Sequence, residues 1–159
     1  MEEKKLAIIA TKGSLDWAYP PFILASTAAA LGYESQIFFT FYGLQLLKKD
    51  LELKVTPLGN PGMPMPMGMD KWFPTLLTAL PGMEAMMTSM MKKKMADKGV
   101  ASIEELRELC QEAEVKLIAC QMTVDLFEMD TAHFIDGVEY GGAATFFEFA
   151  GQSDICLYI

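Results

Sequence analysis

Five short apolar runs, separated by segments with helical periodicity, are the feature that most constrains how this chain of 159 residues can fold. Each run is six or seven residues long, which is typical of strands. The first run contains Leu6, Ile8 and Ile9 with little polar alternation, as in a strand covered on both faces in a parallel sheet. The five predicted strands are residues 5–11, 35–41, 115–120, 135–140 and 154–159.

Helical segments lie between the predicted strands. The clearest begins with a capping box formed by Ser102 and Glu105, followed by apolar residues on one helical face. We also expect helices at residues 14–31, 42–50, 72–80, 83–95, 124–132 and 142–149. Pro20 and Pro21 are expected to restart or kink the first of these. The alternation predicts an α/β fold with a mostly parallel five-stranded sheet and helices on both faces.

A methionine-rich segment interrupts this alternation. Ten of the 13 methionines lie between Met63 and Met95, and residues 57–69 contain four prolines and three glycines. That composition is incompatible with a regular helix or a central strand, so it predicts a long loop. Because the sequence contains no internal repeat and no Ser/Gly linker, we expect one α/β domain over residues 1–159, with an insertion at about 57–98.

Charge and hydropathy exclude several classes of protein. The chain carries 21 acidic and 13 basic residues and a net charge of -8, which disfavours general nucleic-acid binding. The most apolar long stretch, residues 76–91, contains Pro81, Gly82 and Glu84 and is shorter than the roughly 20 residues of a membrane span. Three cysteines do not form a fully paired disulfide framework, so we expect free thiols in a reducing, cytoplasmic compartment.

The three cysteines differ in their predicted surroundings. Cys110 lies on the apolar stripe of its helix and Cys156 lies within the last strand, so both are expected to be core residues. Cys120 ends a strand just before a helix that is predicted to begin near Thr123. Ligands and chemistry collect at this edge of parallel sheets, and a helix N-terminus stabilises a thiolate. Position alone leaves two interpretations of Cys120 open, a functional thiol and strand-end packing.

Three segments carry a family resemblance. They are residues 117–125 (LIACQMTVD), the start of the long loop at 57–61 (PLGNP), and residues 137–144 (GVEYGGAA). With these segments the chain resembles the DsrE/DsrF/DsrH-like family of cytoplasmic sulfur-relay proteins, and more narrowly its Met-rich DsrE-like branch. In that family the cysteine that ends this strand carries sulfur covalently, and its counterpart here is Cys120.

The resemblance implies further properties. These are a flavodoxin-like sheet, a homo-oligomer that is often trimeric, and no metal or organic cofactor. The implied partners are a TusA-like sulfur carrier and a rhodanese-type sulfurtransferase. Cys120 is then expected to hold sulfane sulfur or a thiosulfonate and to pass it to a partner thiol, as a carrier or as a sulfurtransferase-like enzyme.

Two other hypotheses stay open at this point. The chain is a non-catalytic oligomeric interaction module with structural cysteines, or a one-cysteine peroxide reductase that also uses Cys120. The helical methionines between Met83 and Met95 are expected to be partly buried between subunits. The loop at 57–69 is expected to lie beside Cys120 and to give the thiol an apolar cover.

Overall fold

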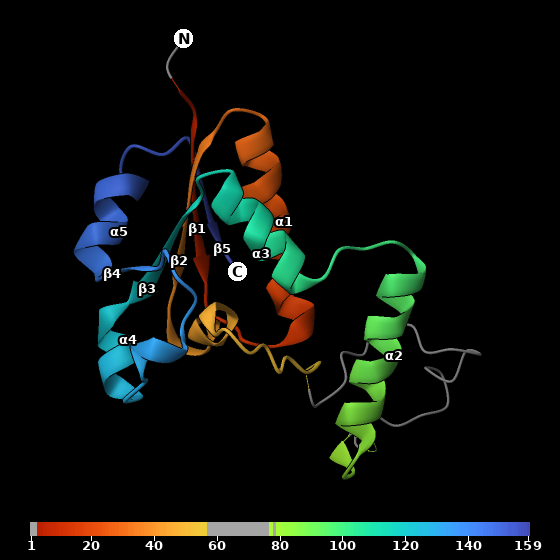
Figure 1. Cartoon of the computed structure of the whole chain (residues 1–159). Coiled ribbons are helices and arrows are strands. Elements are labelled where there is room, and N and C mark those ends of the chain that lie inside the picture. The colour runs from red at the N-terminus through yellow and green to blue at the C-terminus, as the bar shows by residue number, and fades with distance from the viewer. Residues whose placement is uncertain (1–2, 57–76, 78) are drawn as a thin grey trace. The chain divides into compact units, whose positions relative to one another are not determined.

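The computed structural model describes residues 3–56, 77 and 79–159, which form two compact units (Figure 1). The first unit consists of Met1–Gly13, Trp17–Glu52 and Ser102–Ile159, and the second of Ser14–Asp16 and Leu53–Ala101. The predicted loop at 57–69 and most of the predicted helix at 72–80 lie outside the described residues.

The first unit is built on a five-stranded sheet with the order β4-β3-β2-β1-β5, in which every pairing is parallel. The strands are β1 (Lys5–Ala10), β2 (Glu34–Phe39), β3 (Lys116–Cys120), β4 (Glu139–Gly141) and β5 (Ile155–Tyr158). Each strand overlaps one of the five apolar runs, and this confirms the predicted parallel sheet.

Helices cover both faces of this sheet, as the sequence predicted (Figure 1). α1 and α3 lie on one face and α5 on the other. The helices are α1 (Leu15–Ala30), the 3-10 helix η1 (Phe41–Leu47), α3 (Ile103–Glu112), α4 (Gln121–Leu126), the 3-10 helix η4 (Thr131–His133) and α5 (Ala143–Ala150). Because β4 and β5 are at opposite edges, the chain must cross back over the sheet between them. A right-handed crossover in that direction places α5 on the second face.

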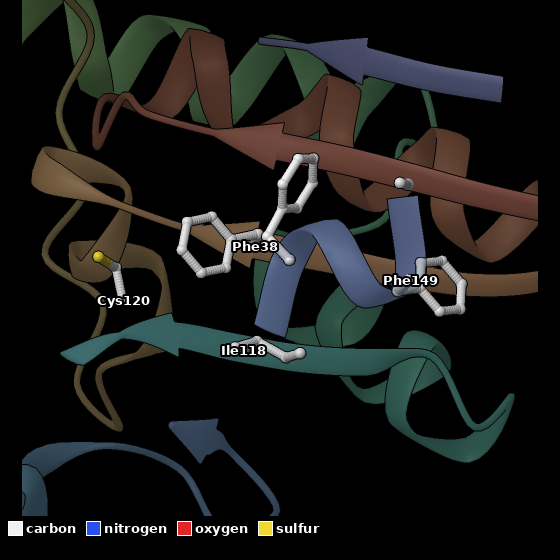
Figure 2. Packing of buried hydrophobic residues seen from close by; sticks show 6 residues of the cluster. Phe38, Ile118, Cys120 and Phe149 are labelled. Atoms are coloured by element: carbon white, nitrogen blue, oxygen red, sulfur yellow. The ribbon is translucent and has the colours of Figure 1, made fainter. Parts of the chain in front are cut away.

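Each face of the sheet has its own apolar core. On the α1 side the rings of Phe22 and Phe39 pack with their centroids 5.9 Å apart. On the α5 side a cluster of buried side chains joins three neighbouring strands to the helix (Figure 2). Its members are Ala7, Phe38, Ile118, Cys120, Phe146 and Phe149. Burial of such side chains stabilises the fold by about 1.5–3 kcal/mol each.

Three local predictions are wrong in detail. The helix does not restart at Pro20 and Pro21, because α1 continues through both prolines. Residues 42–50 were expected to form an ordinary helix, but η1 is a 3-10 helix that ends at Leu47. The single helix predicted for 124–132 is replaced by α4 and η4, and α4 begins at Gln121, so that Cys120 itself is its N-cap residue.

η1 is held against the end of β1 by a close backbone contact. Gly43 lies so near Ala10 that an added Cβ would lie 2.8 Å from the Ala10 carbonyl carbon and would overlap its oxygen. The same turn carries backbone hydrogen bonds from Thr40 N–H to the Ala10 carbonyl and from Gly43 N–H to the Thr40 carbonyl, at 3.1 and 3.0 Å. The buried Arg107 guanidinium of α3 donates to the carbonyls of Leu46 and Lys48 and fixes the far end of η1.

The second unit contains α2 (Met83–Asp97) and residues 53–56, which form no regular secondary structure. Thr56 donates from its N–H and its hydroxyl to the Asp16 carboxylate, at 3.0 and 2.8 Å. Val55 N–H donates to the buried Thr88 hydroxyl of α2 at 3.0 Å. Along α2 Met87 is buried, whereas Met86 and Met90 are exposed.

Within the part of the chain that the structure describes, no helix combines the length and the apolar character that crossing a membrane requires.

The contact at Gly43 gives a first prediction. Gly43→Ala should lower the free energy of unfolding by about 1–3 kcal/mol, because the new methyl group overlaps the Ala10 carbonyl. Urea denaturation followed by circular dichroism measures this loss. Gly142→Ser is the matched control, since a Cβ there meets no heavy atom of the described residues within 4 Å and Ser is a good N-cap. The control should stay within about 0.5 kcal/mol of wild type; an equal loss in both variants would contradict the close contact.

Candidate functional site: a buried thiol at the carboxyl edge of the sheet

Cys120 is the last residue of β3 and the N-cap of α4, so the chain turns from strand to helix at this thiol. It is paired in register with Gly141 of β4 and is 4% exposed. Its side chain belongs to the α5-side cluster and lies toward the arrowhead of β3, near Phe38 (Figure 2). The thiol is therefore at the carboxyl edge of the sheet, as predicted, but covered by apolar neighbours.

Two threonine side chains lie next to this thiol. Thr40 follows the last residue of β2, directly beyond the pair Phe39–Ala119, which places it beside Cys120 in the sheet. Thr123 is in the first turn of α4 and is fully buried. The two hydroxyl oxygens are 3.2 Å apart, and the backbone N–H of Phe41 donates to the Thr123 oxygen at 3.2 Å.

These polar groups change the acidity of the thiol. Burial raises the pKa of Cys120, but hydrogen bonding from the Thr123 hydroxyl and N–H, the Thr40 hydroxyl and the Met122 N–H outweighs burial. The net effect lowers the pKa of Cys120 below the ordinary thiol value. Cys120 makes no close capping hydrogen bond to α4. The donors therefore act as weak sulfur hydrogen bonds that gain strength when the sulfur is charged.

The other two cysteines differ from Cys120 and from each other. Cys110 is fully buried, as predicted, and burial raises the pKa of its thiol to about 12. The expectation that Cys156 is a core residue is wrong, because Cys156 is exposed. Among the residues that the structure describes, its strand β5 pairs with β1 alone and forms an edge of the sheet, so the apolar run 154–159 is covered less than a central strand would be.

The charged side chain of Asp125 is engaged elsewhere. The Asp125 carboxylate accepts a hydrogen bond from the Gln121 amide at 2.8 Å. His133 is exposed on η4. Among the described residues, no group of three or more His, Cys, Asp or Glu side chains is arranged to hold a metal ion.

Exposed apolar side chains surround the turn at Phe41. The ring of Phe41 is 6.2 Å from that of Phe127, and Tyr42 stacks on Phe127 at 6.0 Å. We call this group the aromatic rim; it consists of Phe41, Tyr42, Met122, Leu126 and Phe127, all of them exposed. Phe41 has a positive φ of 48°, a backbone conformation that is strained for a non-glycine residue.

A groove of about 440 Å³ adjoins the aromatic rim. Tyr42 and Phe127 belong to both, and Lys48, Asp130 and His133 supply charged or titratable groups to the groove. Its remaining lining residues are Gln45, Met129 and Phe134.

The sequence analysis singled out Cys120 as the candidate thiol but assigned no role to Thr40 or Thr123. Thr40 stands at the end of β2 as Cys120 stands at the end of β3, so the predicted parallel pairing of the two strands was a usable signal for it. Thr123 was placed at the start of the helix, and it is the third residue of α4. A threonine three residues after an N-cap cysteine points its N–H toward the cap residue, and that spacing was the second signal.

Together, the fold and this site define an α/β protein with a parallel sheet and, at its carboxyl edge, a buried cysteine whose pKa is lowered by hydrogen bonds. Comparison with known proteins makes this more specific. The model of the DsrE/DsrF/DrsH-like family matches residues 2–158. The chain belongs to this family.

Three similar proteins illustrate the relationship. The "Sulfur carrier protein DsrE2" of Allochromatium vinosum is 85% identical over 159 residues, which is 100% of both chains. The "Uncharacterized protein YrkE" of Bacillus subtilis is 32% identical over 99% of this chain and 98% of its own. The crystal structure of the ychN protein of E. coli has a TM-score of 0.55 at 13% identity, covering 98% of this chain and 99% of that one, and it supports the fold.

The contrast between Cys120 and Cys110 gives a second prediction. With small iodoacetamide, alkylation of Cys120 should reach its plateau at a lower pH than alkylation of a free thiol, because the reactive thiolate forms earlier. As long as the chain stays folded, Cys110 should remain unmodified up to pH values near its pKa of about 12. Peptide mass spectrometry after timed alkylation at a series of pH values measures both. Faster labelling of Cys110 than of Cys120 in the folded protein would contradict the described environments.

Proposed function

We propose that this protein is a sulfur carrier in which Cys120 holds sulfane sulfur, or a thiosulfonate, and passes it to a thiol of a partner protein. The observation that carries the proposal is that hydrogen-bond donors lower the pKa of Cys120 although the side chain is 4% exposed. The A. vinosum relative is named a sulfur carrier protein, and this supports the same function.

The chemistry requires one thiolate that is alternately a nucleophile and a leaving group. The Cys120 thiolate attacks the outer sulfur of a donor persulfide, forms a Cys120 persulfide and releases the donor thiolate. A partner thiolate then attacks the outer sulfur and releases the Cys120 thiolate. A lowered pKa makes Cys120 the better leaving group in this second step. Each transfer exchanges one S–S bond for another, so no external oxidant or reductant is needed.

Burial suits the loaded state. A persulfide exposed to water and peroxide is oxidised, and apolar neighbours such as Phe38 and Phe146 restrict that access. The small opening at Cys120 also implies that a partner must approach closely. The aromatic rim offers exposed apolar area for such a partner, for which we propose a TusA-like carrier or a rhodanese-type sulfurtransferase. Free thiols in this role require a reducing compartment, and we propose the cytoplasm.

The function gives a third prediction. Cys120→Ser should abolish sulfur loading from polysulfide or thiosulfate, because the carrying atom is removed. Intact-protein mass spectrometry detects the loading of one sulfane sulfur atom as a gain in mass of about 32 Da. A thiol reductant removes this sulfur, whereas a sulfinate, which adds a similar mass, remains. Cys110→Ser and Cys156→Ser are the matched controls and should load like wild type.

Two outcomes would contradict the proposal. Reductant-sensitive loading that persists in Cys120→Ser would place the carrier sulfur elsewhere. A wild-type protein that gains oxygen from peroxide at Cys120 but no sulfur from either donor would indicate a peroxide reductase instead.

We also propose that the protein is a homo-oligomer, a trimer or higher, that uses the exposed methionines Met86 and Met90 of α2. Met86→Lys with Met90→Lys should lower the molar mass measured by light scattering, because two charges would be buried in the interface. Ala85→Lys with Ser89→Lys, at exposed positions of the same helix, is the matched control. A wild-type protein that is monomeric at micromolar concentration would contradict the proposal.

A further inference from the structure

The hydroxyl groups of Thr40 and Thr123 form a short hydrogen-bonded chain beside the Cys120 sulfur. Their oxygens are 3.2 Å apart, and either hydroxyl can be the donor in that bond. The chain begins at a backbone amide, because Phe41 N–H donates to the Thr123 oxygen at 3.2 Å. Thr123 is 0% exposed, so no bulk water competes for its hydroxyl.

Counting protons shows what this arrangement can donate. The two hydroxyls carry two protons, and the bond between their oxygens uses one of them. Whichever hydroxyl donates in that bond, the other keeps a proton that it can direct at the sulfur. The amide of Phe41 occupies one lone pair of the Thr123 oxygen, which polarises the hydroxyl pair further.

We propose that Thr40 and Thr123 are a positioning pair that directs one hydroxyl proton at the Cys120 sulfur and so stabilises the thiolate form of this buried sulfur. The proposal rests on the proposed function for its biological meaning, since a carrier must release Cys120 as a thiolate. It goes beyond that function in assigning roles to two residues that do not exchange sulfur themselves.

The turn that precedes η1 holds the pair in place. Phe41, whose N–H donates to the Thr123 hydroxyl, has a positive φ of 48°. Thr40 N–H is tied to the Ala10 carbonyl at 3.1 Å, and the close approach of Gly43 to Ala10 fixes the same turn. Backbone contacts at the ends of β1 and β2 therefore hold the two threonines beside the sulfur at the end of β3. These contacts do not involve a charged side chain.

Charged groups do not explain the state of this sulfur. The groups that lower the pKa of Cys120 are hydroxyls and backbone amides. The Asp125 carboxylate, on the same short helix, is held by Gln121. The lowered pKa of Cys120 should therefore depend on the hydroxyls and should change little with salt concentration, in contrast to a thiolate that is paired with a cationic side chain.

The experiment titrates Cys120 in a Cys110→Ala, Cys156→Ser background, with ultraviolet thiolate absorbance and iodoacetamide rate as readouts. Thr40→Val keeps the side-chain shape and removes one hydroxyl together with the hydrogen bond that orients and polarises the remaining Thr123 hydroxyl, so the alkylation rate at neutral pH should fall by about threefold to tenfold. Thr123→Val should lower the rate at least as much, because it removes the hydroxyl that the Phe41 amide polarises. Thr123→Ser keeps the hydroxyl and should restore a rate close to that of the background protein.

Two controls keep the result unambiguous. Thr123→Val also leaves the Phe41 amide without its acceptor, so circular dichroism must show a folded protein before its rate is compared. Thr40→Val and Thr123→Ser supply the decision if that variant unfolds. The proposal would be overturned by an alkylation rate of Thr40→Val that equals the rate of the background protein. It would also be overturned if Thr123→Ser were alkylated as slowly as Thr40→Val.

The outcome of this titration experiment is separate from the outcome of the sulfur-loading experiment that tests the proposed function. If Cys120 loads sulfur while the threonine variants titrate like the background protein, the carrier function stands and the positioning pair is wrong. If the variants shift the titration of a Cys120 that never loads sulfur, the pair stands and the carrier function is wrong.

Discussion

The parallel pairing of β2 with β3 is the constraint on which the site depends. It brings Thr40 beside Cys120, although the two residues are 80 positions apart in the sequence. The turn into α4 then adds Thr123 and two backbone amides around the same sulfur. Without this register the Cys120 sulfur would be a buried apolar thiol like that of Cys110, whose pKa burial raises to about 12.

Burial and hydrogen bonding act on Cys120 in opposite directions, and each has a use in a carrier. In the proposed carrier, burial among Phe38, Ile118 and Phe146 would keep water and oxidants from the bound sulfur. The hydroxyls and amides offset the electrostatic penalty of burial, so that in the proposed transfer Cys120 would be released as a thiolate. A fully exposed thiol would ionise without help but would leave the bound sulfur unprotected.

Much of this architecture was predictable, because local patterns decided it. Short apolar runs predicted the five parallel strands, and the capping box at Ser102 and Glu105 predicted the start of α3, where both of its hydrogen bonds are formed. The position of Cys120 at the end of β3 was predictable for the same reason, since the residue ends an apolar run before a helix. The exposure of Cys156 was not predictable, because sequence does not show which strand takes the sheet edge. The contact of Thr40 with Thr123 likewise depends on register and on an unusual φ at Phe41.

Tracking sulfur through the wild-type protein tests the central claim most directly. The protein is loaded with polysulfide, freed of excess donor and mixed with a thiol acceptor, and tandem mass spectrometry locates the added sulfur before and after mixing. The account predicts one added sulfur on the peptide that contains Cys120, and its transfer to the acceptor in equal amount. Added sulfur on the peptide of Cys156, or sulfur on Cys120 that a thiol acceptor does not remove, would contradict it.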